Sequence, residues 1–376
     1  MSHAVGQRRF LVAEDEFQRW FEQVLSARGF DATEAQLATT FATTAALYAV
    51  ETHGARKLLH LLDDEFRRSQ SCQPAVEHEV IVNADALEVW DAHLKLGPAV
   101  AHLAQQRAHE LASRAGVGIV CVRNTNHYGW GGAYALQFMQ DGFLSGNICQ
   151  GAIPIVTPIG GNEPRMGCNA VSIALESHSP DCPFFLWDAG IGAVSWGEVQ
   201  RSLLDGSPLP TGCVVDKHGQ KTTHADEAAS LLPAGSIGNT LGMLIELLAA
   251  QIGAGDPRFR SAPPNDTPAG EPVTCSFVHF CLNLNLFNAL PFPHARSRAE
   301  NVAAMAEALL DGNGSARLSG MRKWQARQRA EEAGGLLFST ESMDAFRHET
   351  ESQGVPFMSD VREVQVDITE LHVARK

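Results

Sequence analysis

The sequence predicts a mixed α/β fold, and three patterns lead to this prediction. Near the N-terminus apolar residues recur at helical spacing, at Phe17, Trp20, Phe21, Val24 and Leu25. Residues 117–122 form a continuous apolar run rich in β-branched side chains, which is typical of a buried strand. Residues 273–287 alternate in the way of a two-sided strand. The 376 residues can bury a large core and divide into two or three lobes.

The first half of the chain predicts helices over residues 15–29, 35–50, 58–66 and 98–115. Asp31-Ala32-Thr33-Glu34 has the form of a capping box that starts the second helix, and Gly116 is a stop signal for the fourth. Residues 77–90 indicate short strands or an excursion. The strand 117–122 is followed by a polar loop, a helix over 133–140 and a strand over 143–150.

The second half predicts strands over 171–175, 184–187 and 273–287, with a hairpin turn at 216–220. Helices are expected over 241–252, 298–310, 321–333 and 341–353. Residues 253–272 are rich in glycine, proline and aspartate, a composition that indicates a mobile loop or lid.

Charge and composition exclude several classes of protein. A formal net charge of −14 disfavours nucleic acid or an anionic membrane as a partner, although local cations still allow a small anionic substrate. We find no secretory signal, and the most apolar helix, 241–252, carries Glu246. The eight cysteines are scattered, which suits reduced thiols in the cytoplasm. The sequence contains neither a His-Glu-x-x-His motif nor a Cys-x-x-Cys pair, so it predicts no metal site.

The loop after residues 117–122 is the strongest candidate for a site. It contains a histidine, His127, together with hydrogen-bonding side chains and glycines, and a rigid strand and helix hold it at both ends. The alternative is that His127 only fixes its own loop through backbone hydrogen bonds.

A second candidate lies at the junction of two predicted helices, in Thr52-His53-Gly54. The hydroxyl of Thr52 can orient the imidazole of His53, and Arg56 and Lys57 supply positive charge for a carboxylate. On its own, His53 is better explained as a helix-end histidine that caps or packs, and its neighbours are what favour a functional role.

Two further stretches are more ambiguous. Residues 160–169 have the composition of turns. Asp188 follows the strand 184–187, where it is either a functional carboxylate or a strand-end cap or surface ion pair. The glycines Gly190 and Gly192 imitate a Rossmann fingerprint, but the third glycine is replaced by Ser195, so this evidence is weak.

These stretches, in this order, resemble the malate/L-lactate dehydrogenase family of the type-2 kind, which includes sulfolactate dehydrogenase, diketogulonate reductase and cyclic-imine reductases. The resemblance runs from about residue 15 to about residue 254. It implies a non-Rossmann cofactor domain with a largely antiparallel sheet, a helical lobe built from both chain ends, and a homodimer. The corresponding division is 1–115 as the N-terminal helical part of the substrate and dimer lobe, 116–290 as the nicotinamide-cofactor domain, and 291–376 as helices returning to the lobe.

The resemblance also implies roles for individual residues. His53 would give or take a proton, oriented by Thr52 and Asp188 in a relay, although in some members the residue matching His127 is proposed as the base. Lys57 stands where the family has an arginine for the substrate carboxylate, Arg56 lies one residue earlier, and Cys168 and Asn169 match a Thr-Asn pair that contacts substrate. The residues expected to contact NAD or NADP are His127, Tyr128, Gly129, Trp130, Gly131, Ala189 and Gly190. The implied substrate is a small 2-oxo or 2-hydroxy acid or a cyclic imino acid.

The sequence departs from the family where the cofactor is expected. Ile237 occupies the position of a lysine, Cys168 replaces a threonine, and of a late Arg-x-Pro-Gly-Glu turn only Glu341 remains. These departures motivate a second hypothesis, a redox-neutral acid–base enzyme that has lost nicotinamide binding and catalyses an isomerisation, elimination or imine cyclisation. A third is a catalytically idle subunit that binds a partner.

Overall fold

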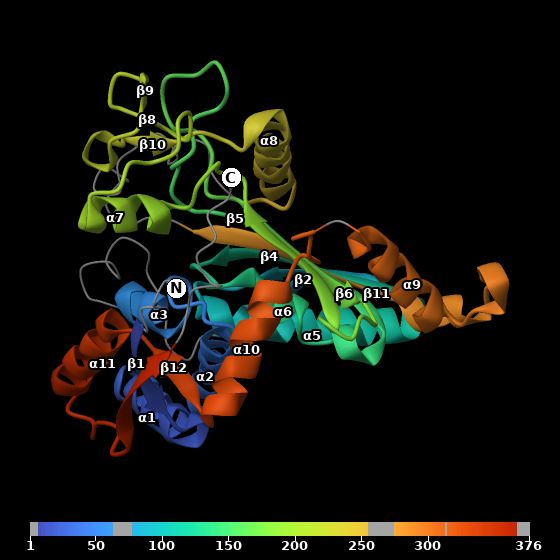
Figure 1. Cartoon of the computed structure of the whole chain (residues 1–376), viewed down its shortest axis with the longest axis horizontal. Coiled ribbons are helices and arrows are strands. Elements are labelled where there is room, and N and C mark those ends of the chain that lie inside the picture. Colours follow the sequence, from blue (N-terminus) through green and yellow to red (C-terminus); the bar gives the residue numbers. More distant parts are fainter. Residues whose placement is uncertain (1–6, 63–76, 255–273, 313, 367–376) are drawn as a thin grey trace. The chain divides into compact units, whose positions relative to one another are not determined.

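The computed structural model describes residues 7–62, 77–254, 274–312 and 314–366 (Figure 1). Their mixture of helices and mainly antiparallel sheets confirms the predicted α/β class. The chain forms two compact units. Unit 1 comprises Met1–Asp63, Glu176–Phe185 and Phe287–Lys376, and unit 2 comprises Asp64–Leu175 and Leu186–Leu286.

Unit 1 is the helical lobe, and both ends of the chain contribute to it, as predicted (Figure 1). Its small sheet has β1 (Gln7–Val12) in the centre, antiparallel to β12 (Leu336–Phe338) on one side and β13 (Val361–Val366) on the other. Its helices are α1 (Glu14–Ala27), α2 (Ala32–Leu47), α3 (Ala55–Leu62), α9 (Arg298–Leu310), α10 (Met321–Ala333) and α11 (Thr340–Gln353). Asp31 caps α2 by accepting a hydrogen bond from the Glu34 amide, at 2.9 Å.

The core of unit 1 is aromatic. The predicted stripe of α1 is buried, and Phe17 lies 5.1 Å from Phe338 on β12, measured between ring centroids. Trp20 lies 4.9 Å from Phe346 on α11. Aromatic side chains bury a large apolar area, so these contacts join the N-terminal helix firmly to the C-terminal elements.

Unit 2 contains most of a seven-stranded sheet in the order β2-β3-β4-β11-β5-β6-β7. The strands are β2 (Glu79–Asn83), β3 (Leu87–Asp91), β4 (Val117–Thr125), β11 (Cys275–Asn283), β5 (Phe143–Gln150), β6 (Ala170–Glu176) and β7 (Phe184–Gly190). The pair β3–β4 is parallel, whereas β2–β3, β4–β11, β11–β5 and β5–β6 are antiparallel. This largely antiparallel sheet confirms that the fold is not a Rossmann fold.

Helix α5 (Gly97–Ala115) connects the parallel strands β3 and β4. It ends at Gly116, whose left-handed φ of 85° fulfils the predicted stop signal. It packs so closely on β4 that a Cβ atom at Gly118 would lie 2.0 Å from the Ala108 carbonyl oxygen. The helix predicted over 133–140 is shorter, because α6 (Gly131–Ala135) stops early and a 3₁₀ turn, η1 (Met139–Asp141), leads to left-handed Gly142.

The remainder of unit 2 is a small layer with its own core. A three-stranded sheet has the order β10-β8-β9, formed by β10 (Ser230–Leu231), β8 (Val214–Val215) and β9 (Lys221–Thr222). The predicted turn at 216–220 joins β8 and β9, and the Asp216 carboxylate accepts from the amides of His218 and Gln220. This part of unit 2 also contains two helices, α7 (Trp196–Asp205) and α8 (Gly235–Gln251).

Some expectations remain untested. Most of the predicted lid, residues 255–272, lies outside the described residues, and so does the end of the helix predicted over 58–66. The three-part division into functional domains stays a prediction; in the structure α5 belongs to unit 2. No helix among the described residues is long and apolar enough to cross a bilayer.

Candidate active site

His53 lies in a tight turn of unit 1 between α2 and α3. The Gly54 amide donates to the Glu51 carbonyl oxygen, at 3.5 Å, and this bond closes the turn around Thr52 and His53. The Thr52 hydroxyl oxygen is 3.1 Å from Nδ1 of His53. The structure therefore brings together the predicted hydroxyl and imidazole, with Thr52 exposed and His53 half-buried.

Gly54 has a packing reason to be glycine. A Cβ atom there would lie 2.6 Å from the Val50 carbonyl oxygen and 3.1 Å from the Ala45 Cβ. Arg56 and Lys57 follow in the first turn of α3, and both are half-buried. Two cations thus lie three and four residues beyond His53, and the choice between them as carboxylate ligand stays open.

The His127 loop is fixed to its surroundings in unit 2. Nδ1 of His127 accepts from the Gly129 amide, at 2.9 Å, so a neutral imidazole carries its proton on Nε2. The Asn126 side-chain oxygen accepts from the Gly97 amide at the start of α5, at 2.7 Å. The hydroxyl of Tyr128 donates to Asn147 on β5, at 2.9 Å, and burial raises its pKa well above the ordinary value.

Asp188 lies on β7 and accepts two hydrogen bonds within unit 2. The Trp130 indole donates to one carboxylate oxygen, at 2.5 Å, and the Ser172 hydroxyl on β6 donates to the other, at 2.7 Å. Trp130 and Asp188 were both predicted site residues, and the structure places them in direct contact. Ser172 was missed, because a lone serine inside an apolar strand gives no signal in the sequence.

The residues packed around Asp188 require a glycine at position 131. A Cβ atom there would lie 2.5 Å from the Asn147 side-chain oxygen and from the Ser172 hydroxyl. The Asn147 amide also donates to the Gly131 carbonyl oxygen, at 2.8 Å. Tyr128, Trp130 and Gly131 are therefore buried support for the loop.

Asn169 is a buried residue with a positive φ of 38°. Its side-chain oxygen accepts from the Gly151 amide, at 3.0 Å, and its amide nitrogen donates to Glu246 on α8, at 2.9 Å. Glu246 also accepts from the Gly167 amide, at 2.9 Å. Glu246, the carboxylate in the apolar helix predicted over 241–252, thus holds this turn in place. The sequence did not reveal this role.

Cys168 and Gly190 are neighbours. A Cβ atom at Gly190 would lie 3.0 Å from the Cys168 sulfur, and burial raises the pKa of the Cys168 thiol. Gly190 is exposed, and His127, Gly129 and Ala189 are half-buried. These residues of the predicted cofactor set retain surface that a ligand can reach.

Besides Cys168, two departures from the family pattern lie at the start of helices. Ile237, in the first turn of α8, is 79% exposed. Glu341 lies in the first turn of α11, directly after β12. In the part of the chain that the structure describes, no three histidine, cysteine, aspartate or glutamate side chains gather as a metal site would require.

Comparison with known proteins identifies the family. The model of the malate/L-lactate dehydrogenase family matches residues 12–346. The chain is 26% identical to the malate dehydrogenase of Pyrococcus abyssi over 305 residues, which cover 78% of this chain and 81% of that protein.

Solved structures share the fold. Sulfolactate dehydrogenase from Methanocaldococcus jannaschii superposes with a TM-score of 0.77 at 22% identity, covering 92% of this chain and 98% of the other. Δ1-Piperideine-2-carboxylate reductase from Pseudomonas syringae pvar. tomato gives a TM-score of 0.77 at 19% identity, covering 90% and 99%. The family match also gives the class of activity, an oxidoreductase acting on small hydroxy or oxo acids. The chain belongs to the malate/L-lactate dehydrogenase family of dehydrogenases and reductases.

Proposed function

We propose that this protein is an NAD- or NADP-dependent oxidoreductase that interconverts a small 2-oxo acid or cyclic imino acid and its reduced form. The observation that carries the proposal is the pair of Thr52 and His53, whose hydroxyl oxygen and Nδ1 are 3.1 Å apart. The similar proteins are named for malate, sulfolactate and a piperideine carboxylate, and these names support the substrate class.

In this proposal His53 transfers the proton. A hydroxyl both donates and accepts, so Thr52 can serve either protonation state of Nδ1. When Thr52 accepts from a protonated Nδ1, the neutral ring has a basic Nε2 that can take a proton from a hydroxyl or amine of the substrate. The imidazolium that results keeps its Nδ1–H on Thr52 and carries on Nε2 the proton that a carbonyl or imine needs in the reverse direction. One residue pair thereby serves both directions of the reaction.

The substrate carboxylate is assigned to the cations of α3. Lys57 would act as a point charge, whereas Arg56 could form a bidentate pair. Cys168 and Asn169 stay candidates for contacting substrate. Because both ends of the Asn169 side chain are bonded within the protein, we propose that it acts mainly by shaping the turn around Cys168.

The residues of unit 2 fit a nicotinamide cofactor in part. His127 and the accessible backbone at Gly129, Ala189 and Gly190 offer donors and acceptors at the surface. Gly190 also leaves beside Cys168 the space that a Cβ atom would fill. When bound there, the nicotinamide would supply or accept the hydride. The relay between His53 and Asp188 stays a prediction, for which a double-mutant cycle is the test.

One observation favours the redox-neutral alternative, namely the exposed Ile237 where the family has a lysine. An isoleucine offers no hydrogen bond and no charge to a cofactor. An enzyme that kept His53 and lost the cofactor would catalyse isomerisation, elimination or imine cyclisation on a similar acid.

We further propose that the protein is a cytoplasmic homodimer. The family resemblance supports the dimer, and so does an apolar surface on α8, where Leu244 and Leu247 are 58% and 66% exposed. The described cysteines carry free thiols, which suits a reducing compartment.

The test is binding of NADH and NADPH to the purified protein by calorimetry, followed by turnover with 2-oxo and cyclic imino acids. We expect micromolar binding of one nucleotide, a loss of about tenfold or more in His127→Ala, and unchanged binding in His218→Ala, an exposed histidine in the hairpin of unit 2. His53→Gln should bind the nucleotide but turn over about 100-fold more slowly. Absence of binding by both nucleotides, reduced and oxidised, would overturn the proposal in favour of the redox-neutral enzyme.

A further inference from the structure

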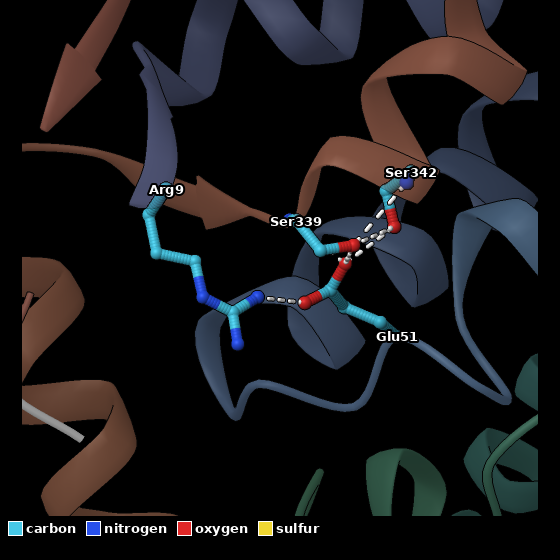
Figure 2. A network of polar contacts seen from close by, with 4 residues as sticks. All are labelled: Arg9, Glu51, Ser339 and Ser342. Atoms are coloured by element: carbon cyan, nitrogen blue, oxygen red, sulfur yellow. Dashed lines mark hydrogen bonds and ion pairs between the residues drawn. The ribbon is translucent and has the colours of Figure 1, made fainter. Parts of the chain in front are cut away.

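Glu51 lies directly before Thr52 and His53, and its carboxylate is the centre of a polar network (Figure 2). One oxygen pairs with the Arg9 guanidinium from β1. The other accepts from the Ser339 amide, at 3.0 Å, from the Ser339 hydroxyl, at 2.5 Å, and from the Ser342 hydroxyl. The side chains of Glu51 and Arg9 are only 16% and 17% exposed. Three segments far apart in the sequence thus meet at one carboxylate within unit 1.

The network keeps Glu51 ionised. Burial acts to raise the pKa of Glu51, but Arg9, Ser339 and Ser342 outweigh burial, and the pKa is lowered below its ordinary value. Hydrogen bonds to a charged acceptor are stronger and more directional than those between neutral groups. The carboxylate is therefore a firm anchor at neutral pH.

This anchor is part of the turn that carries His53. The Glu51 carbonyl oxygen accepts from the Gly54 amide, so the residue with the clamped side chain also closes the turn. On the preceding side, the Val50 amide donates to the Ala45 carbonyl oxygen, at 2.8 Å, and ties the turn to α2. Only Thr52 separates the anchor from the imidazole along the chain.

We propose that Glu51 is a positioning residue that sets the orientation of the His53 imidazole for proton transfer, through the turn that both residues share. The proposal rests on the proposed role of His53. Proton transfer needs the donor and acceptor within hydrogen-bond reach, and a misplacement of about 1 Å can cost about 100-fold in rate. A carboxylate with an ion pair and three further donors limits the movement of the turn more than apolar packing does.

The chain offers a matched control in the same unit. Arg28 and Glu349 form another poorly exposed ion pair, with Arg28 Nε 2.6 Å and Nη2 2.8 Å from the two carboxylate oxygens. Glu349 lies on α11, as Ser342 does, and both of its carboxylate oxygens accept from Arg28, which is not a predicted site residue. Glu349→Gln should therefore cost stability as Glu51→Gln does, without affecting the His53 turn.

The first arm of the experiment is kinetic. In Glu51→Gln we expect kcat to fall about 10- to 100-fold while the KM for the nicotinamide stays within about twofold, because the cofactor candidates lie in unit 2. Glu349→Gln should retain kcat within about threefold. Arg9→Lys keeps the charge and should recover most of the activity that Arg9→Met loses. Equal losses of kcat in Glu51→Gln and Glu349→Gln would overturn the proposal.

The second arm does not need activity. In protein labelled with ¹⁵N-histidine, the His53 ring resonances, assigned from His53→Gln, should shift and titrate differently in Glu51→Gln and remain as in the wild type in Glu349→Gln. Unchanged His53 resonances in Glu51→Gln would refute the positioning role. Should Glu51→Gln fail to fold, Ser342→Ala, which removes one donor, replaces it in both arms. A wild-type protein without nicotinamide binding or turnover would overturn the proposed function, and the resonances would still decide the role of Glu51.

Discussion

At the residue scale, two hydrogen-bond donors fix the orientation of the Asp188 carboxylate. The indole of Trp130 and the hydroxyl of Ser172 each occupy one carboxylate oxygen, and each oxygen keeps a second lone-pair direction for another partner. The carboxylate is thus held in one orientation and can still accept a further hydrogen bond. This arrangement is what a carboxylate that orients an imidazole requires.

Replacing Trp130 with phenylalanine should therefore affect both stability and activity. Loss of a hydrogen bond to a charged acceptor is expected to lower the free energy of unfolding by about 1.5–3 kcal/mol, and kcat/KM should fall because Asp188 is freed to rotate. Urea unfolding and steady-state kinetics measure the two effects. Trp187→Phe is the control, since Trp187 is the exposed neighbour of Asp188. Equal behaviour of the two variants would contradict the role given to Trp130.

The sequence could predict individual site residues but not their partners. Thr52, His53, His127 and Asp188 stand in short motifs whose residue types suggest chemistry by themselves. Ser172 contacts Asp188 only after two strands are placed in one sheet. Glu51 looks like an ordinary helix-end carboxylate until Arg9 and Ser339, far away in the chain, fold against it.

At the element scale, the predicted helices and strands whose apolar residues recur with a strong period agree best with the structure in their bounds. The bounds of β5, α9 and α10 are those that the apolar pattern predicts. Three short strands, β1, β12 and β13, were missed, because their pairing depends on partners distant in sequence. Helix α7 was missed although Ser195 and Glu198 form a capping box. The preceding Gly190 and Gly192 had instead suggested a weak nucleotide-binding motif.

The contact between β11 and α5 contains a fully buried histidine. Nδ1 of His279 lies 2.8 Å from the Gln105 side-chain oxygen, and in this contact the histidine donates because a carbonyl oxygen only accepts. Nε2 has no hydrogen-bond partner among the described residues. Burial, with a smaller contribution from His102, lowers the pKa of His279 to about 3.

This histidine should make the protein less stable in mild acid. The folded-state pKa of about 3 lies below the ordinary value of 6.5, so the neutral imidazole contributes its full stability above pH 6.5. As the pH falls from 6.5 towards 3, the unfolded chain binds a proton that the folded chain refuses. The loss is at most about 1.4 kcal/mol per pH unit.

The measurement is urea unfolding at pH 7.5 and pH 5.0. His279→Gln, which can keep a hydrogen bond to Gln105, should lose about 2 kcal/mol less between these pH values than the wild type does. His218→Gln, at an exposed site, should behave as the wild type. A wild-type pH dependence in His279→Gln would show that other groups cause the acid sensitivity.

At the scale of the whole molecule, the chain leaves unit 1 after residue 63, contributes residues 176–185 to it again, and returns to it at residue 287. The sequence alone shows helices at both ends and strands between them, and the family resemblance was needed to predict that both ends share one lobe. The sequence could not show that α5 packs on β4, because its apolar pattern resembles that of the N-terminal helices.

The exposed apolar side of α8 gives a prediction about assembly. If Leu244 and Leu247 lie in a homodimer interface, then Leu244→Glu with Leu247→Glu should weaken the dimer at least about 100-fold, because burying unpaired charge costs several kcal/mol. Light scattering over a range of concentrations measures this. The control is Leu204→Glu on α7, at a side chain that is 87% exposed. A double variant that remains dimeric would place the interface elsewhere.

The position of β1 has a consequence for the ribosome-bound chain. This strand is synthesised before its partners, and it can pair with β12 and β13 only when residues 336–338 and 361–366 have emerged from the ribosome. Until then, the buried residues Phe10, Leu11 and Val12 have no sheet to enter, and they are an apolar stretch on which a chaperone can act. Arg9 lies on the same strand, so the ion pair with Glu51 and the final geometry of the His53 turn are completed only after β12 and β13 have been synthesised.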